Sequence, residues 1–352
     1  MSDPRPTLKA VARRAGVSVS TASLVFSGRG PVSKPTADKV RAAARDLHYL
    51  GPDPLASSLR RGRAGVVAVI IEGRLLHAFH DPYAVRVLDG LAAVLDDIPT
   101  GMLLMSQDPA RPEHAIERLA GTALDATVFL GCGPAANPLV EHLVSRGIPI
   151  VALGAPRGPG VVCVDIDNRA ASRDLAAHLR GLSHRHLGIV ALPTPAGAGV
   201  APLRTLLDSP FPDVAERARG VADVAGPDVP AIVAPGSDIE AGQSAGATLL
   251  SAADPPTAII AQSDLLAAGV LRAAHDLRLR VPRDVSVAGF DGVPLPWWDE
   301  PGQQLTTVVQ PGDAKGAAAG QAVRDLLDGE HPADVTLPTT LRLGSTTAPP
   351  SR

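Results

Sequence analysis

The chain has 352 residues, of which 45% are hydrophobic and 20% charged, a composition typical of a globular protein with a sizeable core and room for two or three domains. No stretch reaches the ~18 consecutive apolar residues of a membrane-spanning helix. The N-terminus is basic and lacks the apolar core of a signal peptide, so we expect a cytoplasmic protein. Cys132 and Cys163 lie in separate apolar runs without metal-ligand spacing, which argues against a disulfide scaffold and a zinc ribbon.

The net charge of −3 hides a strong asymmetry along the chain. Residues 1–63 contain twelve lysines and arginines against four acidic residues, a net charge of +8, whereas the rest of the chain carries 21 basic and 32 acidic residues, a net charge of −11. A basic head on an acidic body predicts a module that binds a polyanion, attached to a body that avoids polyanions. The alternative is a basic face that is merely solvated.

Three short helices are expected in the basic head. In the first, apolar residues recur at helical spacing between Thr7, a favourable N-cap, and Gly16, which ends the helix. After a tight turn, Ser18 caps a second helix over 19–26, and a third helix runs from about residue 33 or 36 to about residue 49. Two short helices joined by such a turn form a helix-turn-helix.

Small hydroxyl-bearing residues lie on the second of these helices, whose N-terminal end is the part that a recognition helix presents to base edges in the major groove. Ser18, Thr21 and Ser23 can donate hydrogen bonds to phosphates, and the helix N-terminus adds partial positive charge. We expect them to bind DNA. The alternative is that they only cap and solvate the helix.

The next segment begins as a helix and ends in a basic run. Asp53 can cap a helix that Gly62 ends after about two turns, too short to be stable alone in water. We expect this hinge to become helical only when something packs against Leu55, Ala56 and Leu59. This apolar wedge is suited to insertion into a DNA minor groove, with Arg60, Arg61 and Arg63 holding phosphates. The alternative is an ordinary interdomain linker with a basic end.

Residues 7–23 (TLKAVARRAGVSVSTAS) and 52–59 (PDPLASSL) resemble the headpiece and hinge helix of the LacI/GalR family of bacterial transcription regulators. The resemblance implies a homodimer that binds a pseudo-palindromic double-stranded operator, most often as a repressor. It places Val19 and Ser20 at base-reading positions and Leu59 at the intercalating one, with Thr7 among the DNA contacts.

From residue 66 onward, short β-branched runs alternate with helical patterns, which predicts a parallel α/β architecture. The candidate strands are 66–71, 102–105, 126–130, 149–153, 161–165, 187–192, 231–234, 257–261, 285–289 and 305–309. So many strands exceed one sheet, so we expect two doubly wound lobes that bind a ligand between the carboxyl ends of their strands.

The predicted fold is therefore an all-α helix-turn-helix headpiece followed by a periplasmic-binding-protein-like α/β body of two doubly wound parallel-sheet lobes. The expected boundaries are 1–50 for the headpiece, 51–64 for the hinge, 65–163 with 310–332 for the N-terminal lobe, and 164–309 with 333–352 for the C-terminal lobe.

Carboxylates and an aromatic ring follow three candidate strands. Asp264 follows the strand 257–261, Asp291 follows 285–289, and Asp81 and Tyr83 lie in the loop region after 66–71. Such groups are suited to a hydroxyl-rich ligand such as a sugar or a nucleoside. The alternative for each aspartate alone is a helix cap.

Segments 255–264, 281–291 and 305–311 resemble the effector domain of the same family. That resemblance implies ligand contacts from Asp264, Asp291 and Arg217, with the adjacent Arg219 as a rival to Arg217. The family also implies that the effector is most often a carbohydrate, and next a nucleobase or nucleoside.

The sequence offers little support for an enzyme. Dinucleotide-binding and phosphate-binding glycine loops are missing, and His184 and His186 lack a third metal ligand nearby in the sequence, so no cofactor and no metal are expected. The alternative function is a cytoplasmic sugar- or nucleoside-binding or -modifying protein whose basic head serves another purpose. Trp297 and Trp298 either anchor a subunit contact or cover the cleft.

Overall fold

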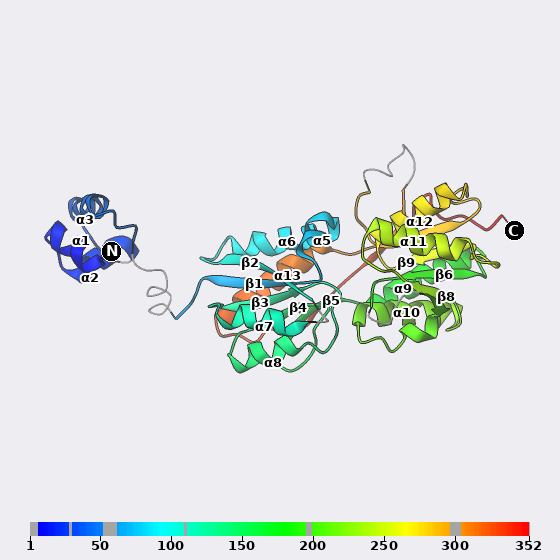
Figure 1. Cartoon of the computed structure of the whole chain (residues 1–352), viewed down its shortest axis with the longest axis horizontal. Coiled ribbons are helices and arrows are strands. Elements are labelled where there is room, and N and C mark those ends of the chain that lie inside the picture. The colour runs from blue at the N-terminus through cyan, green and yellow to red at the C-terminus, as the bar shows by residue number, and fades with distance from the viewer. Residues whose placement is uncertain are drawn as a thin grey trace. The chain divides into compact units, whose positions relative to one another are not determined.

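The computed structural model divides the chain into two compact units, residues 1–65 and 66–352, which are described separately below (Figure 1). It describes residues 6–27, 30–51, 62–108, 111–194, 199–295 and 304–351. The expected hinge helix, with Ala56, Leu59 and Arg60, and the tryptophans Trp297 and Trp298 lie outside these described residues. Within them, no helix is both long and apolar enough to cross a membrane.

The first unit contains three helices: α1 (Leu8–Ala15), α2 (Val19–Ser27) and α3 (Lys34–Asp46). Thr7 caps α1, where its side chain accepts a 3.3 Å hydrogen bond from the backbone N–H of Ala10, and Gly16 ends the helix at φ 68°. The third helix ends at Asp46, earlier than expected, because His48 adopts a left-handed backbone at φ 51°. The helices share one small core, formed by Val11, Ala12, Ala22, Val40, Ala43 and Ala44.

The first lobe of the second unit is a fully parallel sheet with strand order β12-β5-β4-β3-β1-β2 (Figure 1). Its strands are β1 (Val66–Glu72), β2 (Gly101–Gln107), β3 (Ala126–Leu130), β4 (Ile150–Leu153), β5 (Val161–Ile166) and β12 (Val335–Leu337). Because side chains alternate along each strand, one face packs on α6 (Pro82–Leu95) and α13 (Gly312–Leu327), and the other on α7 (Pro112–Ala120) and α8 (Pro138–Ser145). The short helix α5 (Leu75–His80) precedes α6.

The second lobe is a mixed sheet with strand order β13-β11-β10-β9-β6-β8-β7. Its strands are β6 (Leu187–Ala191), β7 (Val200–Pro202), β8 (Pro230–Val233), β9 (Ala258–Ala261), β10 (Ser286–Asp291), β11 (Thr306–Val309) and β13 (Thr340–Arg342). Only the edge strands β7 and β13 pair antiparallel among the described strands. The helices are α9 (Asn168–Gly181), α10 (Pro212–Ala225), α11 (Ile239–Leu250) and α12 (Asp264–Asp276), with a 3-10 helix at Leu203–Leu206.

The prediction of a helical head and a parallel-dominated α/β body is confirmed, and each predicted strand segment overlaps an observed strand. The expected lobe boundaries differ from the observed sheets. Residues Val164–Ile166 of β5 pair with β12, so β5 lies inside the first sheet along its whole length and β12 forms its edge. The two segments of the first lobe therefore extend to residues 166 and 337, beyond the expected ends at residues 163 and 332.

Both sheets are wound in the same way. The order β2-β1-β3-β4-β5 in the first sheet is repeated as β8-β6-β9-β10-β11 in the second. In each sheet the order reverses once, between β1 and β3 and between β6 and β9. Open α/β sheets bind ligands at the carboxyl ends of their strands beside such a reversal, which identifies where a site is expected.

Candidate functional site

The N-terminal end of α2 carries exposed side chains on a fixed cap. Ser18 Oγ accepts a 3.0 Å hydrogen bond from the backbone N–H of Thr21 and lies 2.8 Å from the hydroxyl oxygens of both Ser20 and Thr21. Val19 is 47% exposed although it is apolar, because the inward position of this helix belongs to Ala22. The first turn of α2 therefore presents one apolar and several hydroxyl-bearing side chains at the surface.

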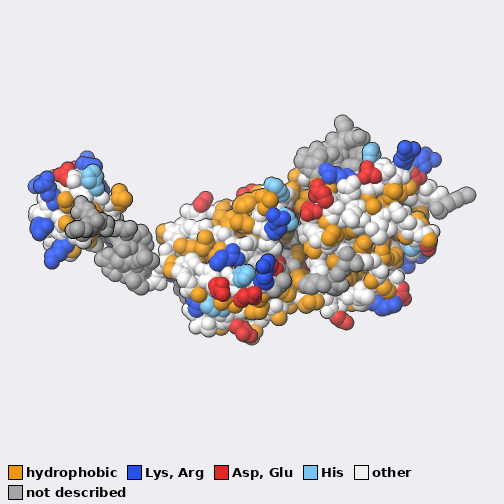
Figure 2. Space-filling model, viewed as in Figure 1, with side chains coloured by type: hydrophobic (Ala, Val, Ile, Leu, Met, Phe, Trp, Pro, Cys, Tyr) orange, Lys and Arg blue, Asp and Glu red, His pale blue; other side chains and the backbone are white. Residues whose placement is uncertain are grey.

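The other predicted DNA contacts of the headpiece lie around this turn. Ser20 and Thr7 are exposed, while Thr21 and Ser23 are half-buried. The lysines and arginines among the described residues of the first unit are all exposed, as Figure 2 shows for one face. They are Lys9, Arg13, Arg14, Lys34, Lys39, Arg41, Arg45 and Arg63.

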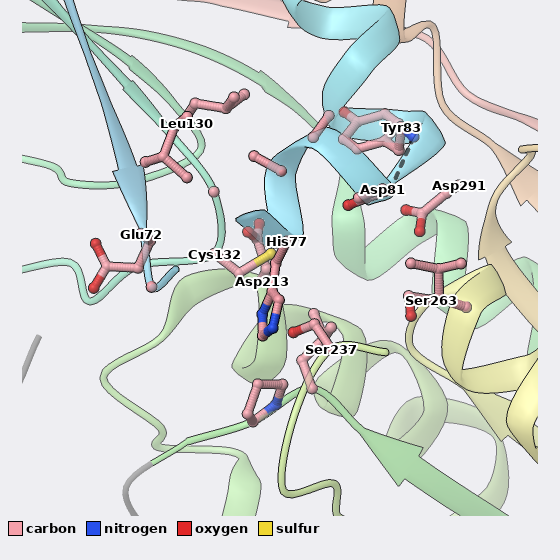
Figure 3. A pocket seen from close by; sticks show the side chains of 18 of the residues that line it. Glu72, His77, Asp81, Tyr83, Leu130, Cys132, Asp213, Ser237, Ser263 and Asp291 are labelled. Atoms are coloured by element: carbon pink, nitrogen blue, oxygen red, sulfur yellow. Dashed lines mark hydrogen bonds between the residues drawn. The ribbon is translucent and has the colours of Figure 1, made fainter. Parts of the chain in front are cut away.

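A cavity of about 460 Å³ opens between the two lobes, a volume typical of small-molecule sites. Its walls are built from the carboxyl ends of the strands beside both order reversals. Ile71 and Glu72 end β1 and Leu130 ends β3, whereas Cys132 follows β3, Leu192 and Thr194 follow β6, and Ser263 follows β9. Asp81, Tyr83, Arg217 and Asp291 also line it, and Figure 3 shows several of these side chains around one space. The structure thus brings together four of the five residues predicted to contact an effector.

Asp81 and Tyr83 enter the cavity at the start of α6. Asp81 is the N-cap of this helix, and its Oδ1 accepts a 2.9 Å hydrogen bond from the backbone N–H of Tyr83 (Figure 3). Burial raises the pKa of the Asp81 carboxyl, while hydrogen bonds from the Tyr83 and Ala84 amides oppose that rise. The Tyr83 hydroxyl donates to Oε1 of Gln310 at 2.9 Å.

Asp291 ends β10 with its carboxyl held at the cavity wall. Oδ1 accepts a 2.7 Å hydrogen bond from Nε2 of Gln310, and Oδ2 accepts one of 3.4 Å from the backbone N–H of Asp264. Its backbone has φ 126°, which a non-glycine residue rarely adopts, so the fold holds this side chain against backbone strain. Burial raises the pKa of Asp291 well above its usual range, and the nearby Arg217 guanidinium acts in the opposite direction.

Arg217, on α10, faces the cavity and is 4% exposed. Its Cζ lies 3.8 Å from the centre of the Phe290 ring, Nε donates to Asn168 Oδ1 at 2.8 Å, and Nη1 donates to the carbonyl of Gln262. The rival Arg219 is not among the cavity-lining residues.

Arg219 instead pairs with acidic groups away from the cavity. Its Nη1 lies 2.5 Å from Glu216 Oε1 and its Nη2 lies 3.5 Å from Asp208 Oδ1. Of the two adjacent arginines, the structure therefore places Arg217 in the candidate site.

The structure does not bring Asp264 to the cavity wall. Asp264 is 0% exposed, and its two carboxyl oxygens accept hydrogen bonds from the Thr307 hydroxyl at 2.6 Å and from the Val293 backbone N–H at 2.8 Å. Burial raises the pKa of this carboxyl to about 7. Partners within its own lobe therefore occupy both carboxyl oxygens of Asp264, which holds the loop after β10 in place. Asp264 is not among the residues that line the cavity, although it was expected to contact the effector.

Other cavity residues were not predicted from the sequence. Asp213 follows a Pro/Gly-rich stretch that obscured its helix, and its Oδ1 accepts a 3.1 Å hydrogen bond from Nδ2 of Asn168. Lys315 is buried on α13 with its Nζ 3.8 Å from Asp165 Oδ1. Gln310 directly follows a predicted strand, so the reasoning that singled out the aspartates could have found it.

Glu72 lies at the end of β1, and its Oε1 is buried without a hydrogen-bond partner among the described residues. Burial, and then the charge of Asp108, raise the pKa of Glu72 to about 7. The part of the chain that the structure describes contains no group of three His, Cys, Asp or Glu side chains that could hold a metal. His184 is instead hydrogen-bonded to Thr257 Oγ1 at 2.9 Å and to the carbonyl of Ala348 at 2.9 Å.

Comparison with known proteins assigns both units. Residues 7–51 match the family of bacterial regulatory proteins of the lacI type, and residues 176–347 match the periplasmic binding protein-like domain. The HTH-type transcriptional regulator Rv3575c of Mycobacterium tuberculosis is 32% identical over 361 residues, which cover 99% of this chain and 98% of that protein. The chain belongs to the LacI family.

Other family members match over nearly the whole chain. The transcriptional repressor CytR of Escherichia coli is 28% identical over 92% of this chain and 91% of its own. The chain in the structure of the transcriptional regulator CelR in complex with cellobiose is 26% identical in sequence to this chain. The two structures have a TM-score of 0.69 over 97% of this chain and 100% of that one. The lac repressor dimer bound to operator has the same fold, with a TM-score of 0.76 at 21% identity over 97% of this chain and 99% of that one.

LacI-family members are transcriptional regulators with a DNA-binding and a ligand-binding domain. In this chain the helix-turn-helix headpiece is the DNA-binding domain, and the two-lobed body is the ligand-binding domain.

Proposed function

We propose that this protein is a cytoplasmic transcriptional repressor that binds a pseudo-palindromic operator as a homodimer and responds to a small hydroxyl-rich effector, such as a sugar, in the cavity between its lobes. The observation that carries the proposal is the convergence of Asp81, Tyr83, Arg217 and Asp291 on one cavity at the carboxyl ends of the strands. Carboxylates and a guanidinium at such a site are suited to ligand hydroxyls. The CelR relative, whose structure holds cellobiose, supports a carbohydrate effector.

The headpiece would read the operator through α2. Val19 and Ser20 contact base edges in the major groove, because they are the exposed side chains of its first turn. Thr7, Ser18, Thr21 and Ser23 contact phosphates, aided by the basic residues around them. Ala56, Leu59 and Arg60 complete the interface in the minor groove, with Leu59 as the wedge.

The effector would act through the relative orientation of the lobes. Asp291 belongs to the second sheet and Asp81 to the first lobe, so a ligand that binds both favours one lobe arrangement over others. In a dimer, that arrangement sets the distance between the two hinge segments. A marginal hinge helix then converts a small shift into a large change in operator affinity.

A gel-shift assay of the full-length chain against genomic DNA fragments tests the DNA-binding half of the proposal. We expect sequence-selective retention that weakens steeply with salt, because phosphate contacts release counterions. Ser20→Ala should reduce the selectivity, whereas Ser33→Ala, an exposed serine beside α3, serves as the matched control and should leave it unchanged. Retention that survives deletion of residues 1–63 would contradict the proposal.

A further inference from the structure

The second helix of the headpiece, α2, has neither charged nor amide side chains. Its sequence, VSTASLVFS, contains no lysine, arginine, aspartate, glutamate, asparagine or glutamine. The basic residues of the neighbouring helices lie on α1 and α3 and are all exposed: Lys9, Arg13, Arg14, Lys34, Lys39, Arg41 and Arg45. The cations that can neutralise phosphates therefore belong to the helices beside α2, and the helix proposed to enter the major groove carries none.

This composition restricts how α2 can distinguish one base from another. In the major groove, arginine or lysine reads guanine, asparagine or glutamine reads adenine, and glutamate or aspartate reads cytosine. None of these side chains occurs in α2. Serine and threonine bind several bases and so select weakly, whereas an apolar side chain recognises the 5-methyl group that thymine alone carries. Thymine is therefore the base that α2 is best suited to recognise.

The hydroxyl groups at α2 are also engaged within the headpiece. The Ser18 hydroxyl oxygen lies 2.8 Å from those of Ser20 and Thr21, and Ser27 donates a 3.3 Å hydrogen bond to the carbonyl oxygen of Leu24. A hydroxyl that turned towards a base would give up such a hydrogen bond, which lowers its net contribution to binding. We therefore expect the apolar side chains of this helix to carry much of its base selectivity.

Two apolar side chains of α2, Val19 and Leu24, are exposed, because the other three belong to the headpiece core or pack against it. Leu24 is 37% exposed. It follows Ser20 by four residues, so both lie on the same face of the helix, about 6 Å apart along its axis. Because successive base pairs are about 3.4 Å apart, Leu24 faces a different base pair from Ser20.

The backbone after α2 supports the Leu24 side chain at the surface. Gly30 has φ 120°, and a Cβ atom at this residue would lie 3.2 Å from Cδ2 of Leu24. One side of the leucine side chain thus rests against the Gly30 backbone. A side chain that is already supported in this way loses little conformational entropy when it contacts a base.

We propose that Leu24 is a specificity-determining residue, which recognises one thymine in each operator half-site through contact with the 5-methyl group. The inference rests on the proposed function, because it specifies part of the sequence that the headpiece reads. It adds one T·A base pair to those that Val19 and Ser20 contact.

Selection of duplexes from a randomised library by the full-length chain supplies the DNA for the test. Each thymine of the selected half-site is then replaced in turn by deoxyuridine, which keeps the base pairing and removes only the methyl group. Gel shift at constant salt concentration measures the dissociation constants. At one thymine, we expect the substitution to weaken binding about fourfold per half-site, the effect of one buried methyl group.

Three variants assign this effect to Leu24. Leu24→Ala should bind the thymine and deoxyuridine duplexes equally well, whereas Leu24→Met retains an apolar contact and should still prefer thymine. In a new selection, Leu24→Arg should enrich guanine at this base pair, because guanine presents two acceptors to an arginine. Leu277→Ala removes a similarly exposed leucine of the body, and this matched control should keep the fourfold difference, as should Val19→Ala.

Three results would overturn the inference: a half-site in which no thymine methyl group affects wild-type binding, a thymine effect of the same size in Leu24→Ala, or a Leu24→Arg selection that returns the wild-type sequence. If hydrogen exchange shows that Leu24→Ala loses α2, the deoxyuridine series of the wild-type chain and the Leu24→Arg selection still decide the question. Failure of the proposed function is a different result, because the wild-type chain would then enrich no sequence at all.

Discussion

The side-chain amide of Gln310 donates a 2.7 Å hydrogen bond from Nε2 to Oδ1 of Asp291. The same amide accepts from the hydroxyl of Tyr83 at 2.9 Å. Gln310 lies where the chain passes from β11 of the second lobe to α13 of the first, so one buried side chain ties the strand end that carries Asp291 to the helix that carries Tyr83. The position of the cavity carboxyl therefore depends on both lobes at once.

Gln310→Ala should destabilise the body by about 1–3 kcal/mol, because Gln310 is 2% exposed and its loss leaves the Asp291 carboxyl and the Tyr83 hydroxyl without this partner. Urea denaturation measures the free energy of unfolding. Gln321→Ala, on the exposed side of α13, is the matched control and should change it by less than about 0.5 kcal/mol. Equal effects of the two substitutions would mean that the Tyr83–Gln310–Asp291 link is not formed in solution.

Glu72→Gln should change how stability depends on pH. The pKa of Glu72 is raised to about 7 in the folded chain, so the folded state holds a proton that the unfolded state releases above pH 4.5. The contribution of Glu72 to the free energy of unfolding is therefore greatest below that pH, falls as the pH rises to about 7, and then levels off.

The glutamine variant lacks this titration, so it should exceed the wild-type stability by about 1–3 kcal/mol at pH 8 and lose that advantage towards pH 4. Denaturation at several pH values measures the difference, with the exposed Glu117→Gln as control. A gain of the same size at pH 4 and pH 8 would contradict the burial of the Glu72 carboxyl.

Arg217→Lys should cost about 1–3 kcal/mol of stability, because an ammonium group cannot stack flat on Phe290 while it donates to both Asn168 and Gln262. Arg219→Lys makes the same chemical change two residues away, at a more exposed ion pair, and should cost less than about 0.5 kcal/mol. Urea denaturation of both variants gives the comparison, and a larger cost for Arg219→Lys would reverse the assignment of the cavity arginine.

Ser18→Ala should weaken α2 by about 1 kcal/mol, because Ser18 Oγ accepts the hydrogen bond from the Thr21 amide at the start of the helix. Val19→Ala removes an exposed side chain and should leave the helix equally protected. Hydrogen exchange of the α2 amides in the full chain distinguishes the two. If Val19→Ala caused the greater loss of protection, Val19 would be part of the headpiece core and not of a DNA-facing surface.

The main strands and the helix-turn-helix could be predicted from the sequence because their signals are local. Long β-branched runs mark the buried strands, and Thr7, Gly16 and Ser18 mark helix ends that the structure confirms. The edge strands β7, β12 and β13 escaped prediction because each has three residues, most of them partly exposed, and gains its hydrogen bonds from distant partners.

The candidate site could be predicted only in part. The end of a strand indicates where a side chain lies, but not which other groups of the protein are hydrogen-bonded to it. Asp264 and Asp291 both lie at or just after a strand end, yet Thr307 and the backbone of Val293 take the oxygens of Asp264. The aliphatic residues that line the cavity, such as Leu130, could not be predicted either, because they follow the same sequence pattern as the residues of any core strand or helix.

The short strands β12 and β13 have a consequence for biosynthesis. Because β12 completes one sheet and β13 the other, neither lobe has its full set of strands until residues 335–342 have left the ribosome. The two lobes should consequently complete their folding together, once this one short segment is available to both sheets.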